Sequence, residues 1–389
     1  MKQVPCLYLN CAFLVYIKDT YLITISNCWE QLYIMKKMLF ITILLTILSC
    51  ADTTRTKEVA KSSIDQSYYR HLSYLLNIKN EVAQEYWPDF AKNDFFHPAV
   101  YYTKENTLVL NPSEHIRKIT DHQEMATFKD IPVIKLPENY MDTINIKFHN
   151  SVSSDSTNLY YLQNVLYFQS FELTKNLLQG DLVDLQDWSI MAIHELFHSY
   201  QRSIPEHWTY LKTIDIPGGP DQFLGAYHND LEWYIESVRK ENDLLKAIWI
   251  DGADLMQNLT SYDSLRNVRI EKIKKEYGVD IREIENYEIT VEGQARYFES
   301  LVKRYLSKKS PSEKSLDKED QKHITDMFKG YDVSKDENLY GIHNNRYYYP
   351  IGYNISMILE KYQVNYKESI YREEQNIHHY LQELKSLQQ

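Results

Sequence analysis

Two histidines stand four residues apart in the segment WSIMAIHELFHSYQRS, residues 188–203, which is otherwise dominated by apolar side chains. Residues i and i+4 of a helix project from one face, so His194 and His198 can bind one divalent ion while Glu195 lies beside it. This is the HExxH arrangement, in which the glutamate takes a proton from water made acidic by zinc. The alternative, two core histidines and a buried glutamate, needs three separate polar partners. The segment therefore predicts a zinc site on a helix over 185–203.

Two histidines are insufficient for such a site, because catalytic zinc usually takes three protein ligands. No histidine follows at the HELFHxxGxxH spacing, and the carboxylates that could replace it are Asp221, Glu232, Glu236 and Glu292. Glu292 is preferred because Gly293 follows it. A glycine inside a helix costs about 1 kcal/mol relative to alanine, which is reasonable where another helix passes close enough to share the ion. Otherwise Gly293 marks a kink and Glu292 faces solvent. Glu236 is the reserve ligand.

The motif HELFHSYQ, followed far downstream by EGQARYFE, resembles the gluzincin class of zinc metallopeptidases, and in particular uncharacterised bacterial lipoproteins. The similarity covers roughly residues 180–365 and includes LEWYIES and YYYPIGYNISMIL as the intervening and terminal helices. It implies a zincin-like fold, with His194, His198 and Glu292 as zinc ligands and Glu195 as general base. The 94 positions from His198 to Glu292 (292 − 198) exceed the spacer of thermolysin-like enzymes by far.

An acyl-transfer site also needs a donor for the oxyanion that forms when hydroxide attacks the carbonyl. Gluzincins commonly use a tyrosine or a histidine. The segment GIHNNRYYYPIGY offers His343, Arg346, Tyr347, Tyr348, Tyr349 and Tyr353. Tyr349, just before a proline at the expected start of a helix, is the predicted donor, and the alternative is a packed aromatic cluster. The Gly/Pro-rich residues 215–230 could form the rim of a cleft.

The rest of the chain divides into a front part with strand-like segments and a longer helical part. AVYYT, NTLVLN, IPVIKL, INIKFHN and NVLYFQS predict a small mixed sheet between about residues 95 and 172, after a short helix at 67–87. Apolar residues then recur at helical spacing over 185–203, 229–249, 262–277, 285–307 and 350–363. We therefore expect a predominantly helical α+β fold. An α+β subdomain would occupy 67–180, and a mainly helical zinc-binding catalytic domain would occupy 181–389. The charged, Ser-rich residues 307–323 predict a solvated loop.

The segment MKKMLFITILLTILSC, residues 35–50, is typical of a secretory signal peptide. Two lysines precede an apolar run that is too short to span a bilayer, which takes about 20 residues. The ending ILSC resembles the lipobox of bacterial lipoproteins, so we expect a lipidated Cys50 that anchors the protein in the cell envelope as a periplasmic or outer-membrane lipoprotein. An ordinary signal or a short anchor is the alternative.

The segments on either side of this signal have different compositions. Residues 51–66 are polar and lack periodicity, which predicts a flexible tether. Residues 1–34 fit poorly in front of a signal, so we expect translation to begin at Met35 or Met38. All four cysteines lie at or before Cys50, so the body after it has neither a disulfide nor a cysteine ligand.

The formal net charge of −11 disfavours binding to nucleic acid, and no basic stripe interleaved with aromatic residues is present. The sequence predicts a zinc-dependent metallopeptidase that acts on a peptide or protein substrate. The alternative is a non-catalytic, zinc-stabilised envelope lipoprotein that binds a glycan, a peptide or a protein. The 33 tyrosines and the unfamiliar ligand spacing motivate this alternative. The intact HExxH argues against a metal-free pseudoenzyme.

Overall fold

The computed structural model describes residues 64–178, 184–214, 220–308, 316–325, 327–372 and 376–388. The upstream extension, the signal peptide with Cys50 and nearly all of the tether lie outside these residues. From Tyr68 onward the described residues belong to one compact unit. Among the described helices, none combines the length and the apolar character that crossing a membrane requires.

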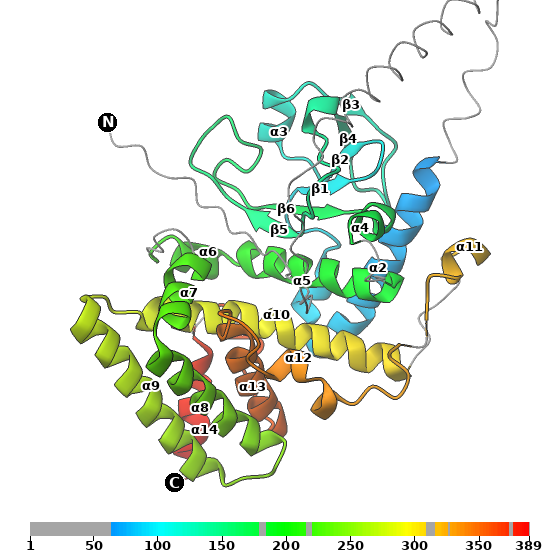
Figure 1. Ribbon diagram of the computed structural model, residues 1–389. Helices are drawn as coiled ribbons and strands as arrows, with labels where there is room; N and C mark the ends of the chain where they lie inside the picture. Colours follow the sequence, from blue (N-terminus) through cyan, green and yellow to red (C-terminus); the bar gives the residue numbers. More distant parts are fainter. Residues whose placement is uncertain are drawn as a thin grey trace, which may run out of the picture. The chain divides into compact units, whose positions relative to one another are not determined.

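Six short strands form one sheet in the order β3-β4-β2-β1-β6-β5 (Figure 1). The strands are β1 (Ala99–Tyr102), β2 (Thr107–Leu110), β3 (Gln123–Glu124), β4 (Val133–Leu136), β5 (His149–Ser151) and β6 (Val165–Gln169). The pairing of β1 with β6 is parallel, and the other pairings are antiparallel. All residues of β1, β2 and β6 are buried, which accounts for their nearly continuous apolar sequence. The prediction of a small mixed sheet is confirmed.

The strand expected over residues 144–150 starts later, at His149. Asp142 accepts hydrogen bonds from the backbone N–H groups of Ile144 and Asn145, at 3.2 and 3.1 Å, and so closes a turn before β5. Side chains of this kind compete with strand pairing for the backbone donors. Ile144 is consequently 82% exposed despite its high strand propensity.

Helices make up most of the remaining structure, and the predicted predominantly helical α+β class is confirmed. They are α2 (Ile64–Tyr86), α3 (Glu114–Ile119), α4 (Phe171–Leu177), α5 (Leu185–Ser203), α6 (Pro205–Leu211), α7 (Pro220–Asp230), α8 (Glu232–Trp249), α9 (Leu255–Tyr277), α10 (Arg282–Lys308), α11 (Lys318–Gln321), α12 (Glu337–Tyr340), α13 (Tyr348–Lys361) and α14 (Ile377–Leu387). Short 3₁₀ turns lie at Pro88–Lys92, Glu138–Tyr140 and Val333–Lys335. The helix expected over 262–277 begins earlier because Asp254 caps it, accepting from the Gln257 N–H at 2.7 Å.

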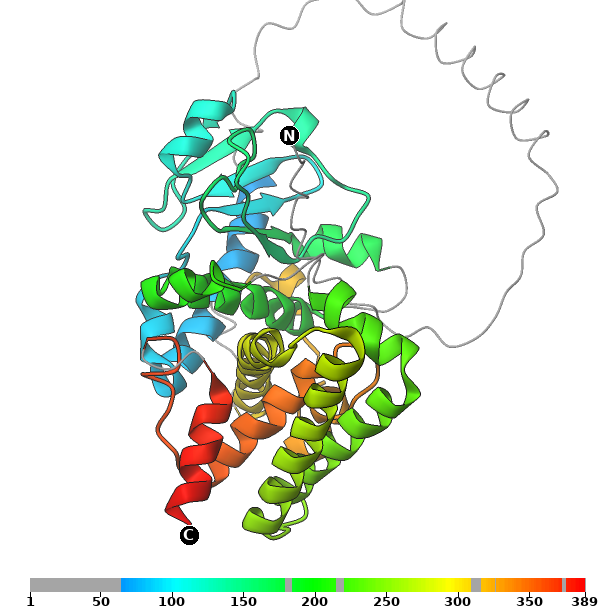
Figure 2. The same cartoon turned by 90° about the vertical axis from the view of Figure 1, so that its left-hand side faces the viewer.

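Helix α5 lies between the sheet and the helices α10 and α13, as the two views agree (Figures 1 and 2). The Asp184 side chain caps its first turn by accepting from the Gln186 N–H at 2.6 Å. The indole of Trp188 donates to the Gln169 carbonyl of β6 at 2.8 Å and ties the helix to the sheet. This arrangement places both flanks of α5 in the core, so its polar side chains must find partners inside the protein.

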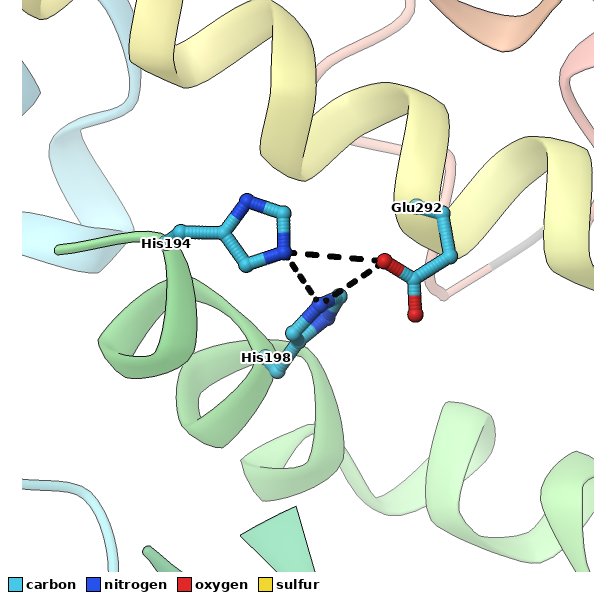
Figure 3. Close-up of side chains that lie close together, drawn as sticks. All are labelled: His194, His198 and Glu292. Carbon is cyan, nitrogen blue, oxygen red and sulfur yellow. Dashed lines mark hydrogen bonds and ion pairs between the residues drawn. The ribbon is translucent and has the colours of Figure 1, made fainter. Parts of the chain in front are cut away.

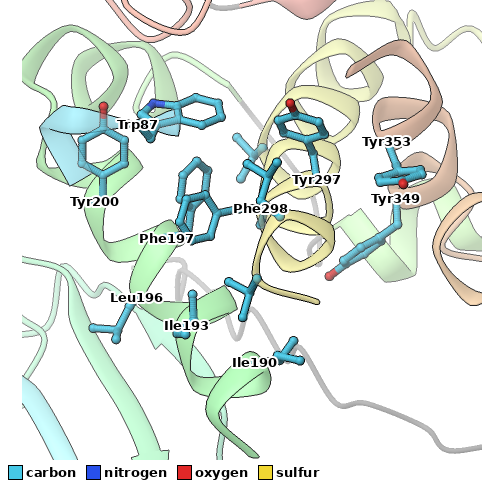
Figure 4. Packing of buried hydrophobic residues seen from close by; sticks show 14 of the residues in the cluster. Trp87, Ile190, Ile193, Leu196, Phe197, Tyr200, Tyr297, Phe298, Tyr349 and Tyr353 are labelled. Atoms are coloured by element: carbon cyan, nitrogen blue, oxygen red, sulfur yellow. The ribbon is translucent and has the colours of Figure 1, made fainter. Parts of the chain in front are cut away.

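An aromatic cluster fixes the other side of α5 against α10 (Figure 4). The Phe197 ring stacks on Phe298 of α10, with centroids 5.2 Å apart, and the Trp87 ring meets Phe197 edge-on at 4.9 Å. Tyr200 packs at the rim of the same cluster. Such pairs contribute about 0.5–1.5 kcal/mol each beyond the area they bury. The crossing of α5 and α10 is therefore held by aromatic packing at Phe197, the residue directly before His198.

Candidate metal centre

Three potential metal ligands converge from two helices (Figure 3). His194 and His198 project from α5, and Glu292 projects from α10; their exposed fractions are 1%, 3% and 4%. The two Nε2 atoms are 3.0 Å apart. Oε2 of Glu292 is 3.6 Å from Nε2 of His194 and 3.2 Å from Nε2 of His198. The buried group could hold a metal ion.

The opposite ring nitrogens of both histidines face acceptors, which fixes the direction of the imidazoles. Nδ1 of His194 lies 2.5 Å from Oε1 of Glu299. Nδ1 of His198 lies 2.8 Å from Oε1 of Gln201, whose amide group donates to the Tyr371 hydroxyl at 2.6 Å and to the Val291 carbonyl. Because both Nδ1–H groups are donors, both Nε2 atoms face Glu292 and can each offer a lone pair to a metal ion that displaces the proton between them.

The convergence of three acceptor atoms is a test of whether the residues fit a metal. Two Nε2 lone pairs and a carboxylate oxygen repel one another unless a cation or a proton lies among them, and among the described residues Oε2 of Glu292 has only the two imidazoles beside it. Three ligands on a tetrahedral ion with bonds near 2.0–2.1 Å are separated by about 3.3 Å. The observed separations of 3.0, 3.2 and 3.6 Å bracket that value. The donor set and its spacing therefore fit a small divalent ion.

In the absence of an ion, a proton takes its place. Burial lowers the pKa of His194, but hydrogen bonds to Glu292 and Glu299 outweigh this and raise it to about 10. Burial raises the pKa of Glu299, and the opposing charge of Arg296 and the bond to His194 bring it down to about 2. The pKa of Glu292 is likewise held well below its usual range by the two histidines, against the effect of burial. A metal ion at this centre must displace the His194 proton.

Glu195 lies next to these ligands on α5 and is 1% exposed. Its Oε2 accepts from Nδ2 of Asn150 at 2.9 Å, whereas its Oε1 is buried without a hydrogen-bond partner. The carboxylate is close enough to raise the pKa of His194 through its charge. One oxygen is thus anchored while the other is left with unused acceptor capacity.

Tyr349, the predicted oxyanion donor, packs against the metal centre. Its ring stacks on that of His194, with centroids 6.1 Å apart and planes at 14°, and the Arg296 guanidinium lies 5.2 Å from its centre. Figure 4 shows it on α13, facing the α5–α10 layer. Tyr347, another candidate, donates instead to Glu285 at 2.7 Å, and Nε2 of His343 contacts the Glu337 carbonyl.

The other carboxylates considered as third ligand are not brought to the histidines. Glu232 and Glu236 lie exposed on α8, where Glu236 pairs with Lys240 at 2.7 Å. The Asp221 side chain and residues 215–219 of the expected cleft rim lie outside the described residues; Pro220–Asp230 form α7.

Gly293 does permit a close helix approach, but the prediction that the approaching helix would share the metal ion was wrong. The helix against Gly293 is α13, where its Gly352 would overlap a Cβ at position 293, and not the histidine-bearing α5. The two glycines face each other, and a Cβ at Gly352 would in turn overlap the Ile289 carbonyl oxygen. The pair therefore sets how closely α10 packs on α13.

Several residues of the centre were missed by reasoning from the sequence. Glu299 stands seven residues after Glu292, which is two helical turns, so its place on the same face could have been read from the spacing. Gln201 follows His198 by three and could have been read in the same way. Asn150 comes from β5, and no local pattern links it to α5.

Comparisons with known proteins add no family to this description: the chain matches no protein-family model, and searches of curated proteins and of solved structures gave no match. The function is therefore argued from the residues of the centre.

Proposed function

We propose that the protein is a zinc-dependent metallopeptidase that hydrolyses peptide bonds with Glu195 as general base. The observation that carries this proposal is the joint placement of a buried His194–His198–Glu292 ligand set and an adjacent carboxylate with one unpaired oxygen. The proposed fold is zincin-like, with the HExxH helix beneath a mixed sheet and the third ligand on a later helix. The ligand set and this order of elements support the assignment.

Zinc, when bound, supplies a Lewis acid that brings the pKa of water toward about 7. The chain's own groups supply the proton transfers. Oε1 of Glu195, free of other donors, accepts a proton from the attacking water and passes it to the leaving amine. Tyr349 is the proposed donor to the oxyanion, because its ring lies against His194.

A second candidate, a non-catalytic protein in which zinc stabilises the helical body, is favoured by the burial of the ligands. Their exposed fractions of 1–4% resemble those of a closed structural site, whereas catalytic sites keep a position open. In that case the partner would be a glycan, a peptide or a protein. Against it stands Glu195, a buried carboxylate oxygen for which a structural zinc site has no use.

Elemental analysis of purified protein, paired with a digest of a peptide library with and without chelator, tests the proposal. The expected result is one zinc per chain and peptide cleavage that chelator abolishes and added zinc restores. Stoichiometric zinc without cleavage of any peptide would favour the non-catalytic alternative, and absence of any bound divalent metal would defeat both.

The location at the cell envelope is a separate proposal that the segment 35–50 supports through its lysines, apolar run and ILSC ending. Cys50 would carry the lipid. Cys50→Ser should release the protein from the membrane fraction of expressing cells, and membrane retention of that variant would contradict a lipid anchor.

A further inference from the structure

An unbroken chain of buried hydrogen bonds ends on the carboxylate of Glu195. The Arg202 guanidinium donates through Nη1 to Oδ1 of Asn164 at 2.8 Å, and Nδ2 of Asn164 donates to Oδ1 of Asn150 at 2.8 Å. Nδ2 of Asn150 then donates to Oε2 of Glu195 at 2.9 Å. The exposed fractions of the three donors are 7%, 0% and 3%. The chain links the far end of α5 back to its centre through the sheet.

The direction of this chain is set by its two ends. A guanidinium has donors and no acceptor, so Asn164 must turn its oxygen toward Arg202 and its NH₂ toward Asn150. Asn150 must then accept with its oxygen and donate with its NH₂, which is the group that an ionised carboxylate requires. Reversing either amide would put two donors or two acceptors face to face. Arg202 thus determines, through two intervening amides, which atom meets Glu195.

The anchor on Glu195 is double. Nδ2 of Asn150 also donates to the backbone carbonyl of Glu195, at 3.0 Å, so it holds both the main chain and the side chain of this residue. Oε2 is consequently engaged, while Oε1 is buried with no partner. When a directional donor holds one oxygen of a carboxylate, the position of the other oxygen is fixed as well. Proton abstraction requires such a fixed position.

No ion pair explains the burial of Arg202. Among the described residues, no carboxylate lies within ion-pair distance of its guanidinium, and its Nε has no acceptor. A buried charge without an ionic partner is expensive. The buried opposite charge that its hydrogen-bond chain reaches is Glu195. Hydrogen bonds in such chains polarise one another, so the chain favours the geometry in which Oε2 is the anchored atom.

We propose that Asn150, Asn164 and Arg202 are positioning residues that hold Glu195 by Oε2 and present Oε1 to the metal centre. This inference rests on the proposed function in so far as it concerns catalysis. The hydrogen bonds that link Arg202 to Glu195 do not depend on which reaction Glu195 serves.

Asn164→Asp is the sharpest test. The introduced carboxylate would still accept from Arg202, now as an ion pair, but its second oxygen accepts as well. Asn150 must then turn its NH₂ toward this carboxylate and present an oxygen to Glu195. We expect kcat for peptide hydrolysis to fall about tenfold or more, with KM and zinc content unchanged and with the variant fully folded at the assay temperature. A merely structural role predicts that kcat follows stability. An unchanged kcat would overturn the proposal.

Asn158→Asp is the matched control, because it makes the same chemical change in the same connection between β5 and β6. The Asn158 side chain donates to Oγ of Ser153 at 3.2 Å and takes no part in the chain to Glu195. Its variant should keep the wild-type kcat. An equal fall in both variants would show that added negative charge alone is responsible and would also overturn the proposal.

A thermal-unfolding cycle on the metal-loaded protein separates this inference from the peptidase proposal, because it needs no turnover. Glu195→Gln provides an NH₂ that can pair with the reversed Asn150, so adding it to Asn164→Asp should raise the melting temperature above the sum of the two single effects. Additive effects would refute the directional chain. Non-additive effects in a protein that cleaves no peptide would refute the peptidase proposal but would support the directional hydrogen-bond chain.

Discussion

Nδ1 of His194 on α5 and Oε1 of Glu299 on α10 are 2.5 Å apart, so the helix that carries Glu292 also holds the ring of His194. Glu299 is itself fixed, since its second oxygen lies 3.6 Å from the Arg296 guanidinium. Partners of this kind orient the imidazole and raise its basicity. The candidate metal centre therefore depends on one face of α10 over two turns.

Replacing Glu299 should weaken metal binding without removing a ligand. Glu299→Ala leaves the His194 ring free to rotate, and loss of such a partner lowers metal affinity roughly 10- to 100-fold. Glu299→Gln keeps an acceptor and should lose less. Competition with a chromophoric chelator measures the affinity. Glu360→Gln is the control, because Glu360 pairs with Arg304 instead, and its affinity should equal that of the wild type. Wild-type affinity in Glu299→Ala would contradict this account.

Substitutions at Glu195 and His198 should separate chemistry from metal binding. Glu195→Gln keeps all three ligands and should retain zinc, but its amide cannot accept a proton, so hydrolysis should fall by about 10²- to 10⁴-fold. His198→Ala removes a ligand and should lose both metal and activity. Zinc content and cleavage of a peptide substrate are measured on the same preparations. Full peptidase activity in the Glu195→Gln protein would exclude the mechanism.

The elements that the sequence predicts well are those defined by local spacing. Helix α5 runs over the predicted residues because apolar positions repeat around His194 and His198 and because Asp184 caps it. Strand β5 starts later than predicted because the Asp142 side chain closes a turn before it. Strand propensity alone does not account for such a turn. Residues that meet through tertiary pairing, such as Asn150 of β5 with Glu195 of α5, leave no periodic trace and could not be foreseen.

The glycine contact between α10 and α13 should be sensitive to a single methyl group. A Cβ at Gly293 overlaps the Gly352 backbone, which cannot move aside as a side chain can, so Gly293→Ala should destabilise the fold by about 1–3 kcal/mol or more. This exceeds the gain of about 1 kcal/mol from helix propensity. Denaturant unfolding measures the effect.

Gly225→Ala in α7 is the matched control for this contact. The three atoms nearest to its Cβ would all belong to the Asn345 side chain, with the amide nitrogen at 2.7 Å, and that side chain can rotate away. We expect a change in unfolding free energy within about 1 kcal/mol of zero, because the helix-propensity gain offsets a small rearrangement. Equal destabilisation of the two variants would argue against a rigid contact at Gly293.

The region predicted as a solvated loop at 307–323 contains instead an anchored part. His71 of α2 is buried and lies 2.9 Å from Oδ1 of Asp320 in α11 and 3.0 Å from Oε1 of Glu172 in α4. Burial lowers its pKa, but the hydrogen bonds and charges of both carboxylates raise it to about 9. The imidazolium at neutral pH therefore joins three segments, while residues 309–315 lie outside the described structure.

The raised pKa of His71 gives a defined pH dependence. Because the folded pKa of about 9 exceeds the ordinary histidine pKa of 6.5, the stabilisation is fully present below about pH 6.5 and is lost as the pH rises through 9. The unfolding free energy of the wild type should therefore fall across this window. That of His71→Gln should be lower at pH 6.5 and change less with pH, because glutamine does not titrate. Urea titrations of both proteins at intervals from about pH 6 to 10 isolate the contribution of His71, since other groups titrate alike in both. Parallel curves for the two proteins would show that His71 holds no proton between the two carboxylates.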